Sequence, residues 1–308
     1  MMKKIIKFIY DKITPKEVRL LLPENSSRVN DARKELLSMG FNIIDPSQFS
    51  EYYNDFLVYA QKLKFSKNWS KDQLKNYIEN PLNFSMLMLN FNYADALIAG
   101  ASYPTSDIAR SGLRIIGIKK KSTCLSSLFL MISPEQDKFF SYADCAIIPE
   151  PSEYQLADIA YDTAINHKLL TGESPKVAFL SFSTNSSAEH YRVDKVKRAV
   201  KLFSKKYPSI EHEKVEVQFD SAICPDIAMS KYAKSTLKGS ANVLIYPNLD
   251  AGNIAYKITE RLGGYSAIGP LLQGFNKPVH DLSRGCSVSD IIDVSIIAAY
   301  QGSRSADV

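Results

Sequence analysis

Short apolar segments alternate with amphipathic stretches along almost the whole chain. Short, continuous apolar runs bounded by turn residues predict buried β-strands. Helices would be expected to show longer stretches with apolar residues at helical spacing. The predicted strands are Val18–Leu22, Phe41–Ile44, Asp95–Ile98, Leu125–Met131, Cys145–Ile148, Val177–Leu180, Val215–Val217, Val243–Tyr246 and Ala267–Leu271.

The stretches between these runs have apolar residues at helical spacing. One of them opens with Ser152, followed three residues later by Gln155, which is typical of a helix cap. The start of the chain, residues 1–10, is interpreted as an amphipathic helix and not as a signal peptide. The other predicted helices are Asn30–Met39, Ser152–Leu170, Glu189–Ser204, Ala251–Leu262 and Val288–Tyr300. Strands that alternate with helices in this way predict an α/β fold with largely parallel sheets.

The length of 308 residues exceeds what one hydrophobic core usually serves, so two three-layer α/β domains are expected. The join is predicted near Pro149–Pro151, which divides the chain into a first domain, 1–148, and a second domain, 149–284. The four cysteines form no C-x-x-C pair, which favours reduced thiols in a cytoplasmic protein over a disulfide framework or a zinc site.

The formal net charge of +5 is compatible with a polyanionic ligand such as coenzyme A or a phosphate ester. A chain that is simply rich in lysine explains the same charge equally well. The basic residues form no dense stripe with interleaved aromatic residues, so a nucleic-acid partner is not expected. No apolar run reaches the length of a membrane span, and a membrane partner is not expected either.

Four segments that follow predicted strands carry small and polar residues, and ligands of α/β folds bind at such strand ends. The backbone N–H groups at the start of a helix can bind an anion. Capping of the following helix is the simpler explanation for any one loop, whereas four such loops together predict an anion-binding cleft. The four loops are Gly100–Asp107, Ser181–Ser187, Pro247–Asn253 and Ser283–Ser287.

At these loops the sequence resembles the phosphate acetyltransferase family, within the wider phosphate acetyl/butyryl transferase group. The resemblance is dense from Lys176 to Gln301 and thinner from about Leu20 to Asp144. Several long, ordered matches are more specific than one short motif. The matching stretches are Lys176–Thr184, Gly239–Ile258, Arg261–Gly264, Ile268–Gly274, Lys277–Pro278 and Asp281–Ser287.

The resemblance implies two domains of isocitrate-dehydrogenase-like architecture, with the active site in the cleft between them. The last helix, at about 285–308, is expected to complete the first domain. The implied reaction is reversible: acetyl-CoA and phosphate give acetyl phosphate and free CoA. No metal and no permanently bound cofactor is implied, and coenzyme A is a substrate. A homodimer is also implied.

The resemblance assigns the chemistry to the loop before the last helix. Asp290 is the implied base for the CoA thiol, Arg284 binds the acyl phosphate, and Ser283 donates a hydrogen bond to the reacting centre. Taken alone, these residues have simpler explanations: a carboxylate in the first turn of a helix, a surface cation and a turn residue. The implied substrate-binding residues are Arg110, Lys64, Cys286, Ser106, Thr184 and Asn253.

The chain departs from the family pattern in its first half. Lys64 replaces an arginine and loses the bidentate guanidinium fork. About one strand–helix unit is absent between Gly40 and Phe41. Tyr103, Ser111 and Ser186 replace a histidine, a proline and a glycine. These differences motivate one alternative, a catalytically weakened relative that binds CoA or a protein partner. A second alternative is a transferase of longer acyl groups such as butyryl, because the sequence does not reveal the width of the acyl pocket.

Overall fold

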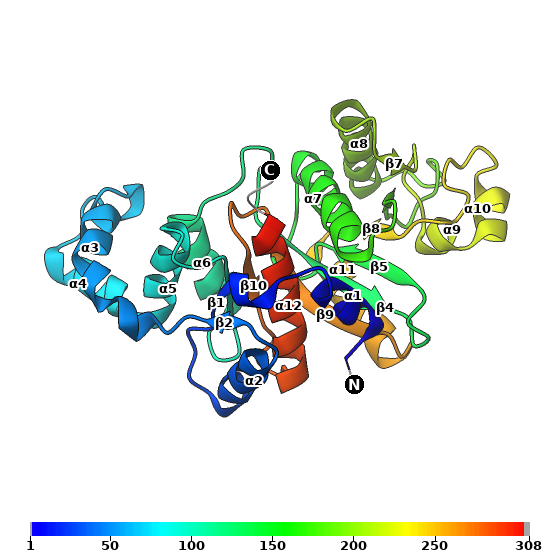
Figure 1. Cartoon of the computed structure of the whole chain (residues 1–308). Coiled ribbons are helices and arrows are strands. Elements are labelled where there is room, and N and C mark those ends of the chain that lie inside the picture. Colours follow the sequence, from blue (N-terminus) through cyan, green and yellow to red (C-terminus); the bar gives the residue numbers. More distant parts are fainter. Residues whose placement is uncertain (1, 305–308) are drawn as a thin grey trace. The chain divides into compact units, whose positions relative to one another are not determined.

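The computed structural model describes residues 2–304 and contains two compact units, each with its own sheet (Figure 1). The first unit comprises Met1–Ile118 together with Phe275–Val308, and the second comprises Lys119–Gly274. The predicted α/β class with largely parallel sheets is confirmed. Within residues 2–304, no helix is long and apolar enough to cross a membrane.

The sheet of the first unit has four parallel strands in the order β10-β3-β1-β2. Every residue of β3 is buried, as expected for a parallel strand that is covered on both faces. The strands are β1 (Arg19–Leu21), β2 (Asn42–Ile43), β3 (Ala96–Ala99) and β10 (Val279–Asp281). Leu20 is in register with Ile43 and with Ala96.

Two groups of helices pack against this sheet (Figure 1). Helices α1 (Lys4–Tyr10) and α2 (Ser27–Ser38) pack on α12 (Val288–Arg304), which contacts β1, β3 and β10. Helices α5 (Pro81–Asn90) and α6 (Thr105–Ile115) pack on each other, and they contact β3 and β10, respectively. The remaining helical elements of this unit are η1 (Pro15–Glu17), η2 (Pro46–Tyr52), α3 (Tyr53–Gln61), η3 (Lys64–Ser66) and α4 (Lys71–Glu79).

Helix α12 is the central helix of the first unit. Every residue from Ile291 to Tyr300 is buried, so the helix is covered on all sides. Its first turn, by contrast, follows the exposed loop Ser283–Ser287. A fully packed helix therefore provides a rigid base for the loop to which the family resemblance assigns the chemistry.

The sheet of the second unit has six strands in the order β7-β6-β8-β5-β4-β9. Pairing is parallel from β7 to β5, and β4 runs antiparallel to both β5 and β9. The strands are β4 (Ser126–Ile132), β5 (Phe139–Ala143), β6 (Lys176–Phe179), β7 (Glu211–His212), β8 (Val243–Ile245) and β9 (Ser266–Gln273).

Helix α7 (Glu153–Thr171) packs on α8 (Tyr191–Lys206) and on four strands, whereas α11 (Leu249–Arg261) contacts β4, β5 and β9. The predicted cap of α7 is confirmed: Ser152 Oγ accepts from Gln155 N, and Ser152 N donates to Gln155 Oε1. Two short helices, α9 (Phe219–Ile223) and α10 (Pro225–Lys231), complete this unit.

The unit boundaries differ from the expected domain limits of 148/149 and 284/285. The chain passes between units after Ile118 and after Gly274. Strands β4 and β5 pair with β9 and β8, so the segment before Pro149 belongs to the second sheet. Strand β10 pairs with β3, so the segment before Arg284 belongs to the first sheet. The boundary depends on strand pairing, which the proline-rich join does not reveal.

Residues 305–308 of the expected last helix, and Met1 of the expected first helix, lie outside the described residues.

The predicted strand Cys145–Ile148 is wrong. Strand β5 ends at Ala143, and the following residues form a loop around the buried carboxylate of Asp144. Asp144 accepts hydrogen bonds from the backbone N–H groups of the loop, which are thereby removed from strand pairing. The donors are Ala146, Ile147 and Ile148.

The predicted strand Val215–Val217 is reduced to a single bridge between Val217 and Leu180. The seven other predicted strands occur with shifts at their ends, which is the usual uncertainty of such limits. Strands β5, β7 and β10 were not predicted from the sequence. Helix α6 was not predicted either, since its first residues were interpreted as part of the loop Gly100–Asp107.

Candidate functional site

The loop Ser283–Ser287 joins β10 to α12 and is held internally by two hydrogen bonds between its own residues. Cys286 N donates to Ser283 O at 2.9 Å, and Gly285 N donates to Ser283 Oγ at 3.3 Å. The side chains of Ser283 and Arg284 are exposed, whereas Cys286 is buried. Within residues 2–304, no hydrogen bond or ion pair engages the Arg284 guanidinium. The loop therefore presents a hydroxyl group and a cation to solvent.

Asp290 lies in the first turn of α12 and forms a capping box with Ser287. Asp290 Oδ2 accepts from Ser287 N and from Ser287 Oγ, both at 2.9 Å. In return, Asp290 N donates to Ser287 Oγ at 3.2 Å. The simpler explanation for this carboxylate, stabilisation of a helix start, is thus part of the structure. The side chain is nevertheless exposed, so its capping role leaves it accessible to a substrate.

Arg28, in the first turn of α2, connects two strand-end loops, although the sequence alone did not identify it as a site residue. Its Nη2 donates to Arg284 O at 3.0 Å and to Ala101 O at 3.3 Å. Its Nη1 donates to Cys286 O and lies 3.7 Å from Cys286 Sγ. The available signal was the position of Arg28 shortly after β1, because polar residues after parallel strands meet at one edge of the sheet.

Glu24 was missed as well, and it occupies the place that an external anion was expected to take. Its buried carboxylate lies at the start of the loop Gly100–Asp107, where it accepts four backbone N–H groups at 2.6–3.0 Å. The donors are Gly100, Ala101, Ser102 and Tyr103. A fixed anion of the protein satisfies these donors. The expectation that this loop start offers its N–H groups to a ligand was therefore wrong.

The other predicted anion loops are also satisfied by side chains of the chain itself. In the loop Ser181–Ser187, the buried Glu216 carboxylate accepts from Ser183 Oγ at 2.9 Å and from Ser186 N at 2.6 Å. In Pro247–Asn253, the Asn248 side chain caps α11 by accepting from Ala251 N. Helix capping, the explanation preferred for a single loop, thus holds for Pro247–Asn253 and for Ser283–Ser287, whereas internal carboxylates bind the N–H groups of the other two loops.

Thr184 and Asn253 belong to the second unit, and both make internal hydrogen bonds. Thr184 is buried, and its Oγ1 accepts from Gln218 N at 3.0 Å. The Asn253 amide donates to Cys145 O at 3.1 Å. Their role in substrate binding stays a prediction.

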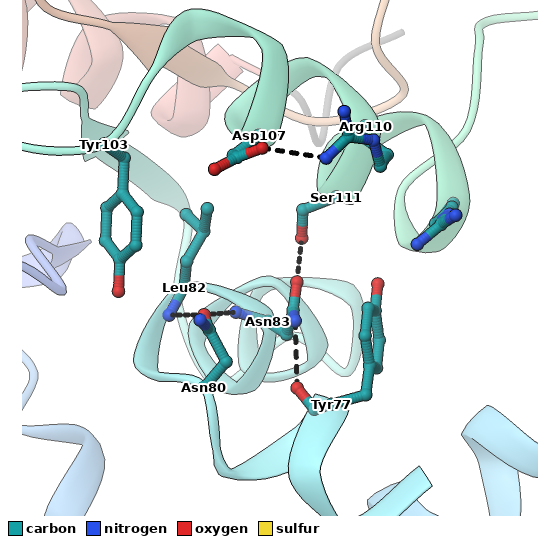
Figure 2. Close-up of a pocket in the computed structure, with 9 residues that line it drawn as sticks. Tyr77, Asn80, Leu82, Asn83, Tyr103, Asp107, Arg110 and Ser111 are labelled. Atoms are coloured by element: carbon teal, nitrogen blue, oxygen red, sulfur yellow. Dashed lines mark hydrogen bonds and ion pairs between the residues drawn. The ribbon is translucent and has the colours of Figure 1, made fainter. Parts of the chain in front are cut away.

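A polar pocket of about 250 Å³ lies within the first unit (Figure 2). Arg110, a predicted substrate-binding residue, lines it and forms an ion pair with Asp107 at 2.8 Å. A second arginine, Arg114, also lines the pocket and was not predicted. The Arg114 guanidinium lies 4.8 Å from the Phe65 ring centroid and 5.8 Å from that of Trp69, where the ring faces can stabilise its charge. The other lining residues are Tyr77, Asn80, Leu82, Asn83, Tyr103, Asp107 and Ser111.

Two residues that we expect to depart from the family pattern lie at this pocket. Ser111 is buried, and its hydroxyl donates to Asn83 Oδ1 at 2.7 Å (Figure 2). Tyr103 lines the pocket, and burial raises the pKa of its hydroxyl. Both side chains are neutral, so the charge of the pocket comes from the two arginines and from Asp107. The predicted residues Lys64 and Ser106 are exposed, and neither lines the pocket.

Asp281 ends β10, two residues before Ser283, and is buried. Thr105 Oγ1 donates to Asp281 Oδ2 at 2.5 Å, whereas Oδ1 has no hydrogen-bond partner in the described part of the chain. Burial raises the pKa of this carboxyl to about 6, because the charged form loses solvation there. Within the loop, burial also raises the pKa of the Cys286 thiol, so the thiolate form of Cys286 is less populated.

Comparison with known proteins gives a consistent result. Residues 8–299 match the family model described as phosphate acetyl/butaryl transferase. A phosphate acetyltransferase of Thermoanaerobacterium thermosaccharolyticum is 38% identical, with 92% of this chain and 87% of the relative covered. A phosphate acetyltransferase of Staphylococcus epidermidis is 37% identical over 97% of this chain and 99% of the relative. A phosphotransacetylase structure from Streptococcus pyogenes superposes with a TM-score of 0.87 at 31% identity, and 99% of each chain is covered.

The S. epidermidis alignment spans 333 positions, more than the 308 residues of this chain. The relative therefore contains segments that this chain lacks. In the structure, β2 lies at one edge of the first sheet and β10 at the opposite edge. A unit lost between Gly40 and Phe41, just before β2, would shorten the sheet at the edge away from the loop Ser283–Ser287.

Proposed function

Because the chain belongs to the phosphate acetyl/butaryl transferase family, we propose that it catalyses reversible acetyl transfer between coenzyme A and inorganic phosphate. The observation that carries this proposal is the exposed pair Ser283 and Arg284 on a loop that buried α12 supports, in a chain that matches acetyltransferases over almost its full length. The names of these relatives favour acetyl over longer acyl groups.

In the direction of thiolysis, the CoA sulfur attacks the carbonyl carbon of acetyl phosphate. A carbon–sulfur bond forms, the carbon–oxygen bond to phosphate breaks, and phosphate leaves. The thiol proton passes to Asp290, which is exposed at the start of α12. A free thiol has a pKa of about 8.5 and a free aspartate one of about 3.9. Full transfer before attack is therefore uphill, so we assign proton transfer and attack to one concerted step.

Arg284 and Ser283 supply the complementary charge. The planar guanidinium fork of Arg284 fits the oxygens of a phosphate group, and its charge offsets the negative charge that develops on the carbonyl oxygen. Ser283 donates a hydrogen bond to the same centre. Cys286 is buried and its thiol pKa is raised, so we assign direct transfer between the two substrates and no acyl-cysteine.

The pocket with Arg110 and Arg114 is the proposed binding site for an anionic part of coenzyme A. Two guanidinium groups and the amides of Asn80 and Asn83 provide the donors that phosphate oxygens require. Lys64, Ser106, Thr184 and Asn253 remain proposed contacts of the same substrate. Coenzyme A and four free cysteines fit a cytoplasmic enzyme, which we also propose.

We propose that the chain forms a homodimer through α11. Ile254, Ile258 and Leu262 follow at intervals of four residues and therefore lie on one face of the helix. They are 56%, 52% and 84% exposed, respectively. A row of exposed aliphatic side chains is typical of a surface that another protein covers.

The proposed function is tested by measuring free CoA thiol released from acetyl-CoA by the purified protein, with and without phosphate. We expect release only with phosphate. Arg284→Ala and Asp290→Asn should each lower turnover by about 100-fold or more, while calorimetry still detects CoA binding to Asp290→Asn. Absence of phosphate-dependent release by the wild type, or unchanged turnover of Arg284→Ala, would refute the proposal.

A further inference from the structure

We propose that Arg28 is a positioning residue of the acyl-transfer site, which holds the backbone of the loop Ser283–Cys286 so that the Arg284 side chain stays directed at the reacting group. This inference rests on the proposed function. It concerns a residue of α2 that lies far from the loop in the sequence and reaches it only through the fold.

The geometry of the guanidinium group defines this role. Its two terminal nitrogens donate to the carbonyl oxygens of Arg284 and Cys286 on one loop and of Ala101 on the other. These contacts direct both terminal nitrogens at backbone carbonyls. Arg28 is therefore suited to act through the loop, and the exposed Arg284 is suited to contact substrate.

The loop depends on this contact because its other hydrogen bonds are local. The bonds that Cys286 N and Gly285 N make to Ser283 close a turn, but they do not fix the turn relative to the sheet. In the described part of the chain, Arg28 alone supplies side-chain hydrogen bonds to Ser283–Cys286 from outside the loop. Without them, three consecutive exposed residues that end in a glycine, Ser283–Gly285, can sample several backbone conformations.

Glu24 makes the contact rigid. It lies four residues before Arg28, between β1 and α2, and its carboxylate holds the backbone N–H groups of Gly100 and Ala101. The carbonyl group of Ala101, which Arg28 contacts, therefore belongs to a fixed segment. The segment from Glu24 to Arg28 thus binds both loops. The Glu24 carboxylate accepts from the N–H groups of the loop after β3, and the Arg28 guanidinium donates to carbonyl groups of both loops.

The inference predicts a loss of turnover without a comparable loss of CoA affinity. A misplaced catalytic group costs roughly 10–100-fold in rate, so we expect Arg28→Ala to lower kcat by that factor and to change KM for CoA by less than about threefold. Arg28→Lys should restore little, because one ammonium group cannot reproduce a planar fork that reaches three carbonyls. Arg19→Ala, which removes an ion pair with Asp95 in the same unit, serves as the matched control and should retain kcat.

The decisive experiment is a double-mutant cycle for phosphate-dependent thiol release. If Arg28 acts through Arg284, Arg28→Ala should have almost no further effect on kcat in the Arg284→Ala background. Unchanged kcat of Arg28→Ala, or losses that multiply in the double variant, would overturn the inference. Equal loss of kcat in Arg19→Ala would do the same, since it would indicate a general effect of lower stability.

Hydrogen exchange provides a measurement that is independent of turnover. We expect faster amide exchange in peptides that contain Gly285 and Cys286 in Arg28→Ala, and unchanged exchange in the second unit. Unchanged exchange at this loop would contradict the proposed contact. If the wild type shows no acetyl transfer, the proposed function fails, whereas the exchange measurement still decides whether Arg28 holds the loop.

Discussion

Two buried carboxylates lie near the proposed catalytic loop, and their surroundings differ. Glu24 accepts four backbone N–H groups, which compensate its charge. Asp281 accepts one hydroxyl group from Thr105, and its Oδ1 has no hydrogen-bond partner within residues 2–304. Both oxygens of the first carboxylate have hydrogen-bond partners, whereas the second carboxylate is costly to ionise in the folded protein.

This difference predicts a pH effect of Asp281. Its folded-state pKa of about 6 exceeds that of a free aspartate, so between about pH 4 and pH 6 the unfolded chain loses a proton that the folded protein keeps. The contribution of Asp281 to stability therefore falls as the pH rises through this range, by about 2–3 kcal/mol in total. Relative to wild type, Asp281→Asn should gain free energy of unfolding as the pH rises from 4 to 7, measured by urea denaturation. A difference that does not vary with pH would contradict this account.

At the scale of elements, the periodic pattern predicted most strands and the long helices because burial on a strand or a helix face is a local property of the sequence. It failed at Cys145–Ile148, where an apolar run folds around the side chain of Asp144. The prediction of external anions at the strand-end loops also failed, since only the fold brings Glu24 and Glu216 to the N–H groups of distant segments. The catalytic candidates Ser283, Arg284 and Asp290 came from family resemblance, whereas Arg28 required the structure.

The anchoring of the loop after β3 by Glu24 predicts a stability effect. In Glu24→Gln, one side-chain oxygen remains as a hydrogen-bond acceptor. The amide nitrogen that replaces the other oxygen cannot accept hydrogen bonds from the backbone N–H groups that face it. Unsatisfied buried donors and the loss of charged hydrogen bonds should lower the free energy of unfolding by about 2–4 kcal/mol, measured as a lower urea midpoint. The exposed Glu17→Gln is the matched control and should change stability by less than about 0.5 kcal/mol. Equal stability of the two variants would show that Glu24 does not anchor the loop.

At the scale of the whole molecule, two units with separate sheets share one chain that crosses between them twice. The family and the fold class were predictable from the sequence, and so were seven strands and the long helices. The crossing points were not, since they depend on the pairing of β4 with β9 and of β10 with β3. The expected position of the active site between two domains stays a prediction.

The exposed apolar face of α11 gives a prediction about assembly. Replacing Ile258 with glutamate places a charge in the centre of the row, where burial in an interface would be unfavourable. We expect light scattering to show that the wild type is a dimer and that Ile258→Glu is a monomer. Calorimetry should show that the variant still unfolds in a cooperative transition, so that its subunit remains folded. A monomeric wild type, or a variant that stays dimeric, would show that this face is not the interface.

The most direct test of the central claim is to follow the reaction of acetyl-CoA with phosphate by phosphorus NMR in the presence of the purified protein. We expect acetyl phosphate to appear in step with free CoA, and added acetyl phosphate and CoA to be converted to acetyl-CoA and phosphate. Release of CoA without formation of acetyl phosphate, or no reaction in either direction, would contradict the assignment as a phosphate acetyltransferase.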